Sequence, residues 1–577
     1  MMSCLRSSTR ALLFLAALGA AVAVVPSRAM AQRDTVATNE LPRDVAREVV
    51  ALYNATTALR MADEVEIPAD SVVRGDVAVL DGPVIVAGRI AGRLLAINAD
   101  VLLRKGARID GDLLVVGGEV EGSEGATIGG ELRVYHPPLR YTREGGQLVA
   151  VAEGPHPGEQ WWRRFELGGK PNSNRLEIAS AGAYNRTEGL PVKVGPVLYR
   201  DQGWGYLRLN ADAIVRTGSS FASATADVGH LVRGEARVGR RFGVTVAGEL
   251  YDVATGVEDW HLSDMEAGLA AFVFRRDYRD YYERHGGRVL AALRATESAD
   301  LTLSYGDERW GARLTRNPPT LFNGEKSWRV NPVLDAGRFH RLEARLRVDT
   351  RNDTFNPWAG WYVLAEYERS VGAITEPGPT SPGVRTMPAG DTRYQRGFLD
   401  VRRYNRLAPD AALNVRGVLG GWLGGSPLPL ERRFSIDGPG TVPGFDFRAG
   451  EPPDVGTCST DGAAPGRPAQ CERIALAQLE YRKDLRLSVG NGQGGARGMR
   501  FRADGAWLFF ADAGRGWLVN APGHPLDIGR QALPPLSTYR TDIGGGVDFT
   551  YLGLYVAKAL SAPKEPMNLF IRLRHRF

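Results

Sequence analysis

Beyond about residue 166, the chain consists of long segments in which apolar and polar residues alternate, separated by turn-forming stretches. Segments 207–215, 244–250, 301–305 and 342–348 each place a small or apolar residue at every second position. Alternation with a period of two is typical of a strand that has one apolar face. Roughly 410 residues, at roughly 26 per strand with its connection, suit about 16 antiparallel strands.

The length of this region argues against simpler architectures. A soluble all-β region of this size normally divides into separate sandwiches joined by linkers, and the sequence shows no such break. After residue 31, no stretch offers the roughly 20 uninterrupted apolar residues of a transmembrane helix. The 70 Gly, 19 Tyr and 11 Trp suit the turns and interfacial girdles of a membrane barrel. We therefore predict an all-β chain in which residues 166–577 form a transmembrane antiparallel β-barrel.

The last nine residues alternate strictly, as expected for a closing barrel strand. One face carries Leu569, Ile571, Leu573, His575 and Phe577, and the other carries Arg572, Arg574 and Arg576. Apolar side chains on such a strand meet lipid, while arginines on its other face line a wet lumen. A terminal aromatic residue also resembles the recognition signal of outer-membrane barrels. Leu573 and Phe577 are therefore the expected C-terminal barrel signal.

The N-terminus predicts export. Arg6 and Arg10 precede an apolar run over 11–25, and Ala29-Met30-Ala31 offers a small-residue cleavage pattern. This is the layout of a secretory signal peptide over residues 1–31, and the run is too short to be a comfortable membrane anchor. The formal charge of +6 falls to about +3 once the three arginines of this segment are removed. Such a weak charge argues against a nucleic-acid partner.

Residues 66–135 contain an internal repeat. The pattern apolar-x-Gly-x-apolar begins at Val73, Ile90, Ile109 and Ile128, with offsets of 17, 19 and 19 residues. Alternating β-branched residues, with Gly where the chain bends, indicate the coils of a β-solenoid, in which each coil buries its apolar side chains on the next. The repeat resembles the bactofilin-like, polymer-forming β-helix. A short stack of β-sandwich hairpins is the alternative.

Two segments flank this repeat. Residues 32–65 are polar and then weakly helical, with Val45, Val49 and Tyr53 on one side, which favours a short packing or linker helix. Residues 136–165 contain two His-Pro steps and the pair Trp161-Trp162, and are expected to form a linker that ends in an aromatic collar at the membrane interface.

Two cysteines remain after Cys4 is lost with the signal peptide. Cys458 and Cys471 lie close together in a Gly/Pro-rich stretch. In an exported chain an even pair of this kind predicts a disulfide, here closing a short surface loop. A zinc site needs more ligands than this stretch offers.

Enzyme motifs are missing. The sequence has no Gly-x-Ser-x-Gly elbow, no P-loop and no His-Glu-x-x-His, and its histidines are scattered singly. Residues 277–284 are rich in charge and Tyr, and a polar strand or loop lining explains them better than a binding site does. We therefore expect no enzymatic activity, no cofactor and no metal.

The C-terminal third resembles the bacterial surface antigen family, which includes the BamA- and FhaC-type barrels that insert or export proteins. Segment 431–434 leads into a Gly-rich stretch that looks like the tip of the family's lumen loop. Residues 510–514 match its Phe-x-Asp-x-Gly strand, and 184–190 look like a first barrel strand of related proteins. The resemblance implies a lumen-loop motif and a barrel-wall motif. The first comprises Gly438, Gly440, Val442, Pro443, Gly444, Phe445 and Arg448, and the second Phe510, Asp512 and Gly514.

Two departures from the family pattern matter. Pro443 stands where the family's tip usually has an arginine that reaches an acidic partner inside the barrel, and Arg448 is the nearby candidate to replace it. The family usually carries POTRA domains, whereas this chain has the solenoid repeat in that region. An arginine on the loop and Asp512 on the wall would form a charge-assisted hydrogen bond that holds the loop in the pore.

Three functions remain open. The first is an outer-membrane barrel that transports or assembles exported polypeptides or small substrates, gated by the loop at 438–448. The second is a lipid-embedded anchor whose solenoid docks a periplasmic partner or self-associates. The third is a soluble exported β-protein or hydrolase.

Overall fold

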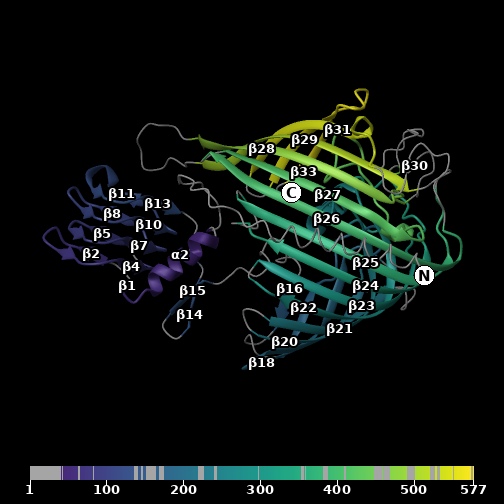
Figure 1. Ribbon diagram of the computed structural model, residues 1–577, viewed down its shortest axis with the longest axis horizontal. Helices are drawn as coiled ribbons and strands as arrows, with labels where there is room; N and C mark the ends of the chain where they lie inside the picture. The colour runs from purple at the N-terminus through teal and green to yellow at the C-terminus, as the bar shows by residue number, and fades with distance from the viewer. Residues whose placement is uncertain are drawn as a thin grey trace, which may run out of the picture.

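The computed structural model contains two β-rich bodies, a solenoid and a large curved sheet (Figure 1). It describes residues 41–577 apart from 42, 63–64, 82, 136–138, 140, 145–146, 151–163, 168–173, 219–226, 240–242, 297, 352–356, 358, 381–386, 409–410, 448–457, 459–467, 490–500, 520–526, 529–532, 550–551 and 574–575. The predicted signal peptide lies outside these residues.

The N-terminal body is a β-solenoid, as the repeat predicts. Three parallel sheets run along it, in the strand orders β1-β4-β7-β10-β13, β2-β5-β8-β11 and β3-β6-β9-β12. The strands are β1 (Leu59–Ala62), β2 (Val65–Ile67), β3 (Val72–Val73), β4 (Val77–Leu80), β5 (Val84–Val86), β6 (Arg89–Ile90), β7 (Leu94–Ile97), β8 (Val101–Leu103), β9 (Arg108–Ile109), β10 (Leu113–Val116), β11 (Val120–Glu121), β12 (Thr127–Ile128) and β13 (Leu132–Tyr135).

The repeat offset is one turn of this solenoid. Val77 pairs with Leu94, and Leu94 pairs with Leu113, so equivalent residues stack in register. These inward side chains are fully buried and form one apolar core along the axis. The strand β1 shows that the solenoid begins before residue 66, where the sequence placed its start.

One outer face of the solenoid is covered. The helix α2 (Arg43–Asn54) buries Val45 and Val49 against the sheet that contains β7, so the predicted packing helix is confirmed. The expected linker at 136–165 instead contains a hairpin, β14 (Tyr141–Glu144) with β15 (Gln147–Ala150), because Leu148 finds an apolar surface beside the helix. The Asn54 side chain holds that hairpin through two hydrogen bonds to the Leu148 backbone, of 2.7 and 2.8 Å.

The second body is an antiparallel, barrel-like sheet in which each strand pairs with the next along the chain. Sixteen strands form it, in agreement with the prediction. They are β17 (Arg175–Ser180), β18 (Pro191–Gln202), β19 (Gly205–Arg216), β20 (Val228–Val238), β21 (Gly243–Val257), β22 (Asp280–Arg294), β23 (Ala299–Ala312), β24 (Ala336–Asp349), β25 (Gly360–Glu376), β26 (Gly390–Ala408), β27 (Ala411–Gly425), β28 (Arg473–Val489), β29 (Phe501–Val519), β31 (Arg540–Phe549), β32 (Leu552–Ala559) and β33 (Asn568–Arg572).

Two short segments extend this sheet. The strand β16 (Arg164–Leu167) precedes β17 and pairs with it, and β30 (Asp527–Ile528) runs parallel to the end of β29. In the part of the chain that the structure describes, no hydrogen-bonded ladder joins β33 to β16 or β17. The two edge strands are therefore not joined by a backbone ladder in these residues.

The alternation of the sequence sorts side chains to the two faces. Outward residues form an exposed apolar band, as a lipid-facing wall requires: Leu207, Leu209, Val244, Val246, Leu250, Val289, Leu301, Leu303, Leu342 and Leu419.

Connections between the wall strands are short at one end of the barrel, such as Gly203-Trp204, and long at the other, where α5 (Asp264–Phe274) and the 47-residue stretch between β27 and β28 lie. Figure 1 places the solenoid on the side of the short connections. Among the described residues, no helix is long and apolar enough to cross a membrane.

The C-terminus departs from the predicted strand. Leu569 and Ile571 are 69% and 47% exposed on the outer face, as expected. The strand ends at Arg572, however, and the chain bends at Leu573. Arg576 turns inward and is buried. The prediction of a continuous strand to Phe577 is therefore wrong: the strand ends before Leu573, and Arg576 lies beside Asp512 in the interior.

Candidate functional site

The described part of the long connection between β27 and β28, residues 426–447, 458 and 468–472, folds into the barrel interior and fills part of it. Its apolar side chains Leu428, Leu430, Phe434, Ile436 and Val442 are each at most 2% exposed. They pack against inward aromatic side chains of the wall: Tyr282, Trp310, Phe339, Tyr394, Phe398 and Trp517. This segment, the lumen loop, therefore brings its own apolar core into the barrel interior.

Arg432 anchors the start of the lumen loop. Its guanidinium Nε lies 3.1 Å from Glu368 Oε1, and Nη1 donates a 2.9 Å hydrogen bond to the Tyr282 hydroxyl. The same guanidinium stacks 4.4 Å from the Trp310 ring centroid. Ion pair, hydrogen bond and cation–π contact converge on one buried side chain, and charged groups are buried in proteins when they are paired in this way. The sequence alone placed Arg432 in the segment 431–434 before the loop tip but indicated no role for it.

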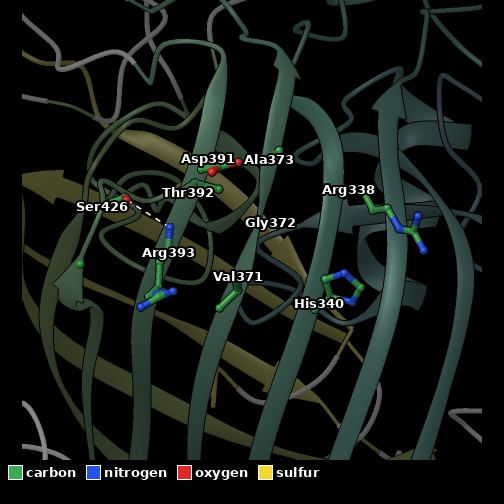
Figure 2. Close-up of a pocket in the computed structure, with 10 residues that line it drawn as sticks. Arg338, His340, Val371, Gly372, Ala373, Asp391, Thr392, Arg393 and Ser426 are labelled. Atoms are coloured by element: carbon green, nitrogen blue, oxygen red, sulfur yellow. Dashed lines mark hydrogen bonds between the residues drawn. The ribbon is translucent and has the colours of Figure 1, made fainter.

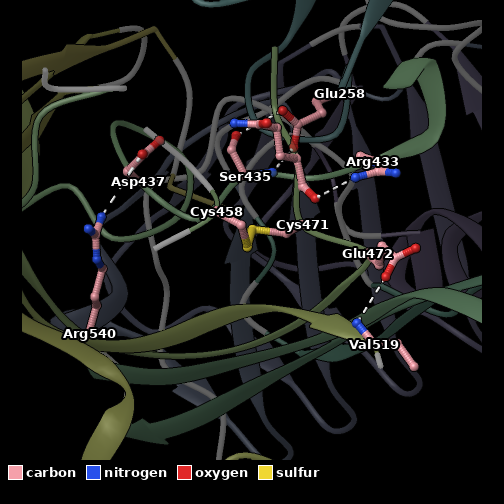
Figure 3. Close-up of a disulfide and its surroundings, with 10 residues drawn as sticks. Glu258, Arg433, Ser435, Asp437, Cys458, Cys471, Glu472, Val519 and Arg540 are labelled. Carbon is pink, nitrogen blue, oxygen red and sulfur yellow. Dashed lines mark hydrogen bonds and ion pairs between the residues drawn. A yellow bond between two sulfur atoms is a disulfide. The ribbon is translucent and has the colours of Figure 1, made fainter. Parts of the chain in front are cut away.

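The base of the lumen loop is braced at several further points (Figure 3). Ser435 donates its backbone N–H and its hydroxyl to Glu258 of the β21 side, at 2.5 and 2.8 Å. Arg433 donates to the backbone carbonyl oxygens of Leu428 and Gln470, at 2.8 and 3.3 Å. These contacts fix the loop's entry into the barrel.

Cys458 and Cys471 form the predicted disulfide. Both are at most 2% exposed, and most of the loop that they close, residues 459–467, lies outside the described residues. Cys471 also exchanges two backbone hydrogen bonds with Phe434, of 3.0 and 3.1 Å. The backbone hydrogen bonds tie the two stems of the lumen loop together, and the disulfide joins Cys458, which follows the tip, to the second stem.

The predicted lumen-loop motif lies at the tip of this loop. Gly440 has φ of +106°, a conformation that side chains rarely adopt, and a Cβ there would lie 2.2 Å from the His261 carbonyl oxygen. Gln478 donates from Nε2 to the Thr441 carbonyl oxygen at 2.8 Å, and Asn568 donates to that of Pro443 at 3.1 Å. The tip therefore reaches both β28 and the last strand.

Two carboxylates on neighbouring strands meet this tip region. Asp512 of β29 and Asp542 of β31 are directly paired across the ladder. The Gly444 backbone N–H donates to Asp542 Oδ2 at 2.5 Å. Asp542 thus contacts the loop directly, and the sequence did not single it out.

Asp512 forms its ion pair with the C-terminal Arg576. Arg576 also stacks over the Phe510 ring, 3.6 Å from its centroid. The pair is buried, with side-chain exposures of 0% and 2%. Arg448, the expected partner, lies outside the described residues, so an Arg448–Asp512 contact stays a hypothesis. An arginine does contact the wall motif from the barrel interior, but it is Arg576 of the C-terminus.

Gly514 of the wall motif lies where the lumen loop presses on the barrel. A Cβ at this position would lie 2.5 Å from Ile436 Cγ2 and 3.4 Å from Val442 Cγ1. Both are loop residues, so the bare backbone of Gly514 makes room for the loop. Val442 and Phe445, the apolar members of the tip motif, are buried.

A scan against protein-family models matches residues 254–546 to the Omp85 superfamily domain. The match covers half of the chain and includes both motifs. The chain belongs to the Omp85 superfamily. The resemblance to the surface antigen barrels is thereby confirmed.

A search of solved structures returned the following similarities. BamA from Haemophilus ducreyi lacking POTRA domains 1–3 is 15% identical, with a TM-score of 0.39 over 69% of this chain and 70% of that one. CdiB from Acinetobacter baumannii is 10% identical, with a TM-score of 0.31 over 75% of this chain and 64% of that one. CdiB from Escherichia coli has the same identity and TM-score over 75% and 67%. A search of curated protein sequences found no match.

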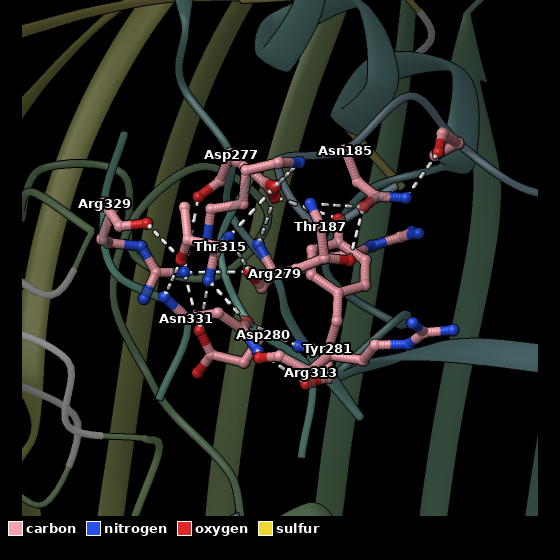
Figure 4. A network of polar contacts seen from close by, with 12 residues as sticks. Asn185, Thr187, Asp277, Arg279, Asp280, Tyr281, Arg313, Thr315, Arg329 and Asn331 are labelled. Atoms are coloured by element: carbon pink, nitrogen blue, oxygen red, sulfur yellow. Dashed lines mark hydrogen bonds and ion pairs between the residues drawn. The ribbon is translucent and has the colours of Figure 1, made fainter. Parts of the chain in front are cut away.

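The long-loop end of this Omp85 barrel is tied together by a buried ionic network (Figure 4). Arg186 lies 3.0 Å from both Asp277 and Asp280, and donates to Asn331 Oδ1 at 2.9 Å. Segment 184–190, expected as a first barrel strand, is a turn between β17 and β18 that carries Arg186 into this network. The charged segment 277–284 lines the interior, as expected. The connections between β17 and β18, between β21 and β22, and between β23 and β24 are thus joined at this end of the barrel.

Proposed function

We propose that this Omp85 protein transports or inserts exported polypeptides, or other exported substrates, at the outer membrane, and that its lumen loop is the gate. The observation that supports the proposal is the anchoring of the loop inside the barrel, through Arg432 at its start and Gly444 at its tip. The function involves no bond chemistry and no cofactor. Its partners are outer-membrane lipid and the exported substrate.

The arrangement of the loop suggests how a gate would work. Arg432 and the tip are held by different wall strands, β25 and β31, so withdrawal of the loop requires both sets of contacts to break. The tip also contacts Asn568 of β33, the strand whose outer edge has no ladder to β17 in the described residues. Movement of the tip would therefore be coupled to the seam between the sheet edges.

Loss of the protein from its native host tests this function. We expect other outer-membrane barrels, or a specific exported polypeptide, to fail to reach their folded form, seen as loss of heat-modifiable mobility in gels. Complementation with the wild-type gene should restore them. Complete export and assembly of all outer-membrane proteins without this chain would contradict the proposal.

A second function is an outer-membrane anchor that presents the solenoid. The supporting observation is that the solenoid stands where the family usually has POTRA domains, and that its final coil leaves Leu132 39% exposed. This coil offers an edge for a periplasmic partner or a second copy. Deletion of residues 59–135 separates the two functions: lost partner co-purification with unchanged barrel assembly in the host favours the anchor.

A further inference from the structure

The outer face of the barrel carries a group of basic side chains at the long-loop end. They lie on four neighbouring strands, β23 to β26, and all are exposed: Arg309, Arg338, His340, Arg369 and Arg393. Their neighbours in sequence, such as Phe339 and Tyr394, are buried in the interior. The basic residues therefore point outward, away from the lumen.

The strand register places like charges side by side. Arg309 is directly opposite Arg338, and Val371 lies between His340 and Arg393. Like charges directly opposite each other destabilise a sheet unless an anion balances them. Asp307 pairs with Arg338 at 2.5 Å, but the Asp307 side chain is 40% exposed and that of Arg338 is 56% exposed. Such an exposed ion pair contributes little and is easily exchanged for a better anion.

A pocket of about 720 Å³ opens among these residues (Figure 2). Arg338, His340 and Arg393 stand around Val371 in its wall, and Asp391 lies at its upper edge. In the described residues, neither Arg369 nor Arg393 has an ion pair with a carboxylate. Four arginines against the carboxylates of Asp307 and Asp391 leave the group positively charged.

Below this group the surface becomes apolar. Leu303, Leu342 and Leu419 are 49%, 50% and 53% exposed on the same face. Val371, 40% exposed, links the pocket to this band. Long connections mark the extracellular end of an outer-membrane barrel, so the basic group lies at the level of the outer leaflet. A ligand that fits needs an anionic head and several acyl chains.

We propose that this pocket binds the phosphate groups of a phosphorylated glycolipid of the outer leaflet. Arginine guanidinium groups form strong charge-assisted hydrogen bonds with phosphate oxygens, and the leucine band below receives the acyl chains. The bound phosphates supply negative charge to the opposed Arg309 and Arg338 beyond that of Asp307, the carboxylate that pairs with Arg338. This function is independent of transport and of the lumen loop.

Lipid retention measures the proposal directly. The full-length protein in detergent is incubated with bisphosphorylated lipid A, with dephosphorylated lipid A, or with inorganic pyrophosphate, and bound ligand is quantified by native mass spectrometry. The test variant is Arg369→Gln with Arg393→Gln. The matched control is Arg403→Gln, which lies on the same strand and face as Arg393 but at the short-turn end. Heat-modifiable mobility verifies that each barrel is folded.

The expected result has three parts. The wild type retains bisphosphorylated lipid A at least about fivefold more than the dephosphorylated form, since removal of the phosphates removes several hydrogen bonds between guanidinium groups and charged oxygens at once. The double variant loses this preference, and Arg403→Gln keeps it. Equal retention of both lipids, an unchanged double variant, or an equal loss in the control would overturn the proposal. Pyrophosphate binding as strong as that of lipid A would reject a lipid ligand in favour of free phosphate.

Discussion

Replacement of Arg432 by methionine tests whether the lumen loop closes the barrel. The variant keeps the length of the side chain but removes its ion pair with Glu368 and its hydrogen bond to Tyr282. Removal of one partner from a buried ion pair costs about 3–5 kcal/mol, because the other charge stays buried. Arg341 lies 3.5 Å from the same Glu368 carboxylate, and the Tyr394 hydroxyl donates to it at 2.5 Å. Because these two groups still stabilise the charge, we expect a cost of about 3 kcal/mol, the lower end of this range.

A loss of about 3 kcal/mol raises the population with a displaced loop about 100-fold, at about 1.4 kcal/mol for each factor of ten. Single-channel recording in planar bilayers measures this as the open fraction. The double variant Arg432→Met with Glu368→Gln should recover part of the closure, because it also removes the unpaired charge.

Arg347→Met is the matched control for this experiment. Arg347 also points inward and pairs with Asp300 at 2.5 Å, but its side chain is 53% exposed and lies away from the loop. We expect its open fraction to equal that of the wild type. An Arg432→Met barrel that stays as closed as the wild type would show that the loop does not hold the pore shut.

Four further predictions concern other parts of the chain. Arg576→Gln leaves Asp512 as an unpaired buried charge and should lower the free energy of unfolding by about 3 kcal/mol, seen as a lower temperature for the heat-modifiable gel shift. Asp512→Arg should raise single-channel conductance. Gly514→Leu should displace the loop and expose new cleavage sites to limited proteolysis. The hydrogen bond from Arg93 lowers the pKa of Asp76, so the ionised carboxylate stabilises the solenoid above the ordinary value of 3.8, and this stabilisation is lost as the pH falls below it. Hydrogen exchange of β4 should therefore become faster at low pH in the wild type. Asp76→Asn should show no such pH dependence.

Local pattern was enough to predict the two architectures. Alternation along 207–215 and its counterparts predicts strands with one lipid-facing side, because successive side chains point to opposite faces. The Gly-centred repeat at 73–134 predicts stacked coils, because each coil must bury its apolar side chains on the next. The motifs at 438–445 and 510–514 also lie where the resemblance implies, on the lumen loop and the adjacent wall.

Contacts between residues far apart in the sequence could not be predicted from local patterns. Arg432 is one of many arginines in the sequence, and only the fold brings it to Glu368 and Trp310. Asp542 has no distinguishing neighbours in sequence and becomes notable through its contact with Gly444. The burial of the disulfide likewise depends on where the loop travels after it leaves the barrel wall.

The sequence by itself determined that segments 207–215, 244–250, 301–305 and 342–348 are wall strands with one apolar face, and that 73–134 forms stacked coils, because these features follow from periodicities of a few residues. Only the tertiary structure decided that the lumen loop fills the interior, and that Arg576 turns back to Asp512. These outcomes depend on the desolvation and pairing of charges from strands far apart in the chain, and no local pattern encodes which charges will meet.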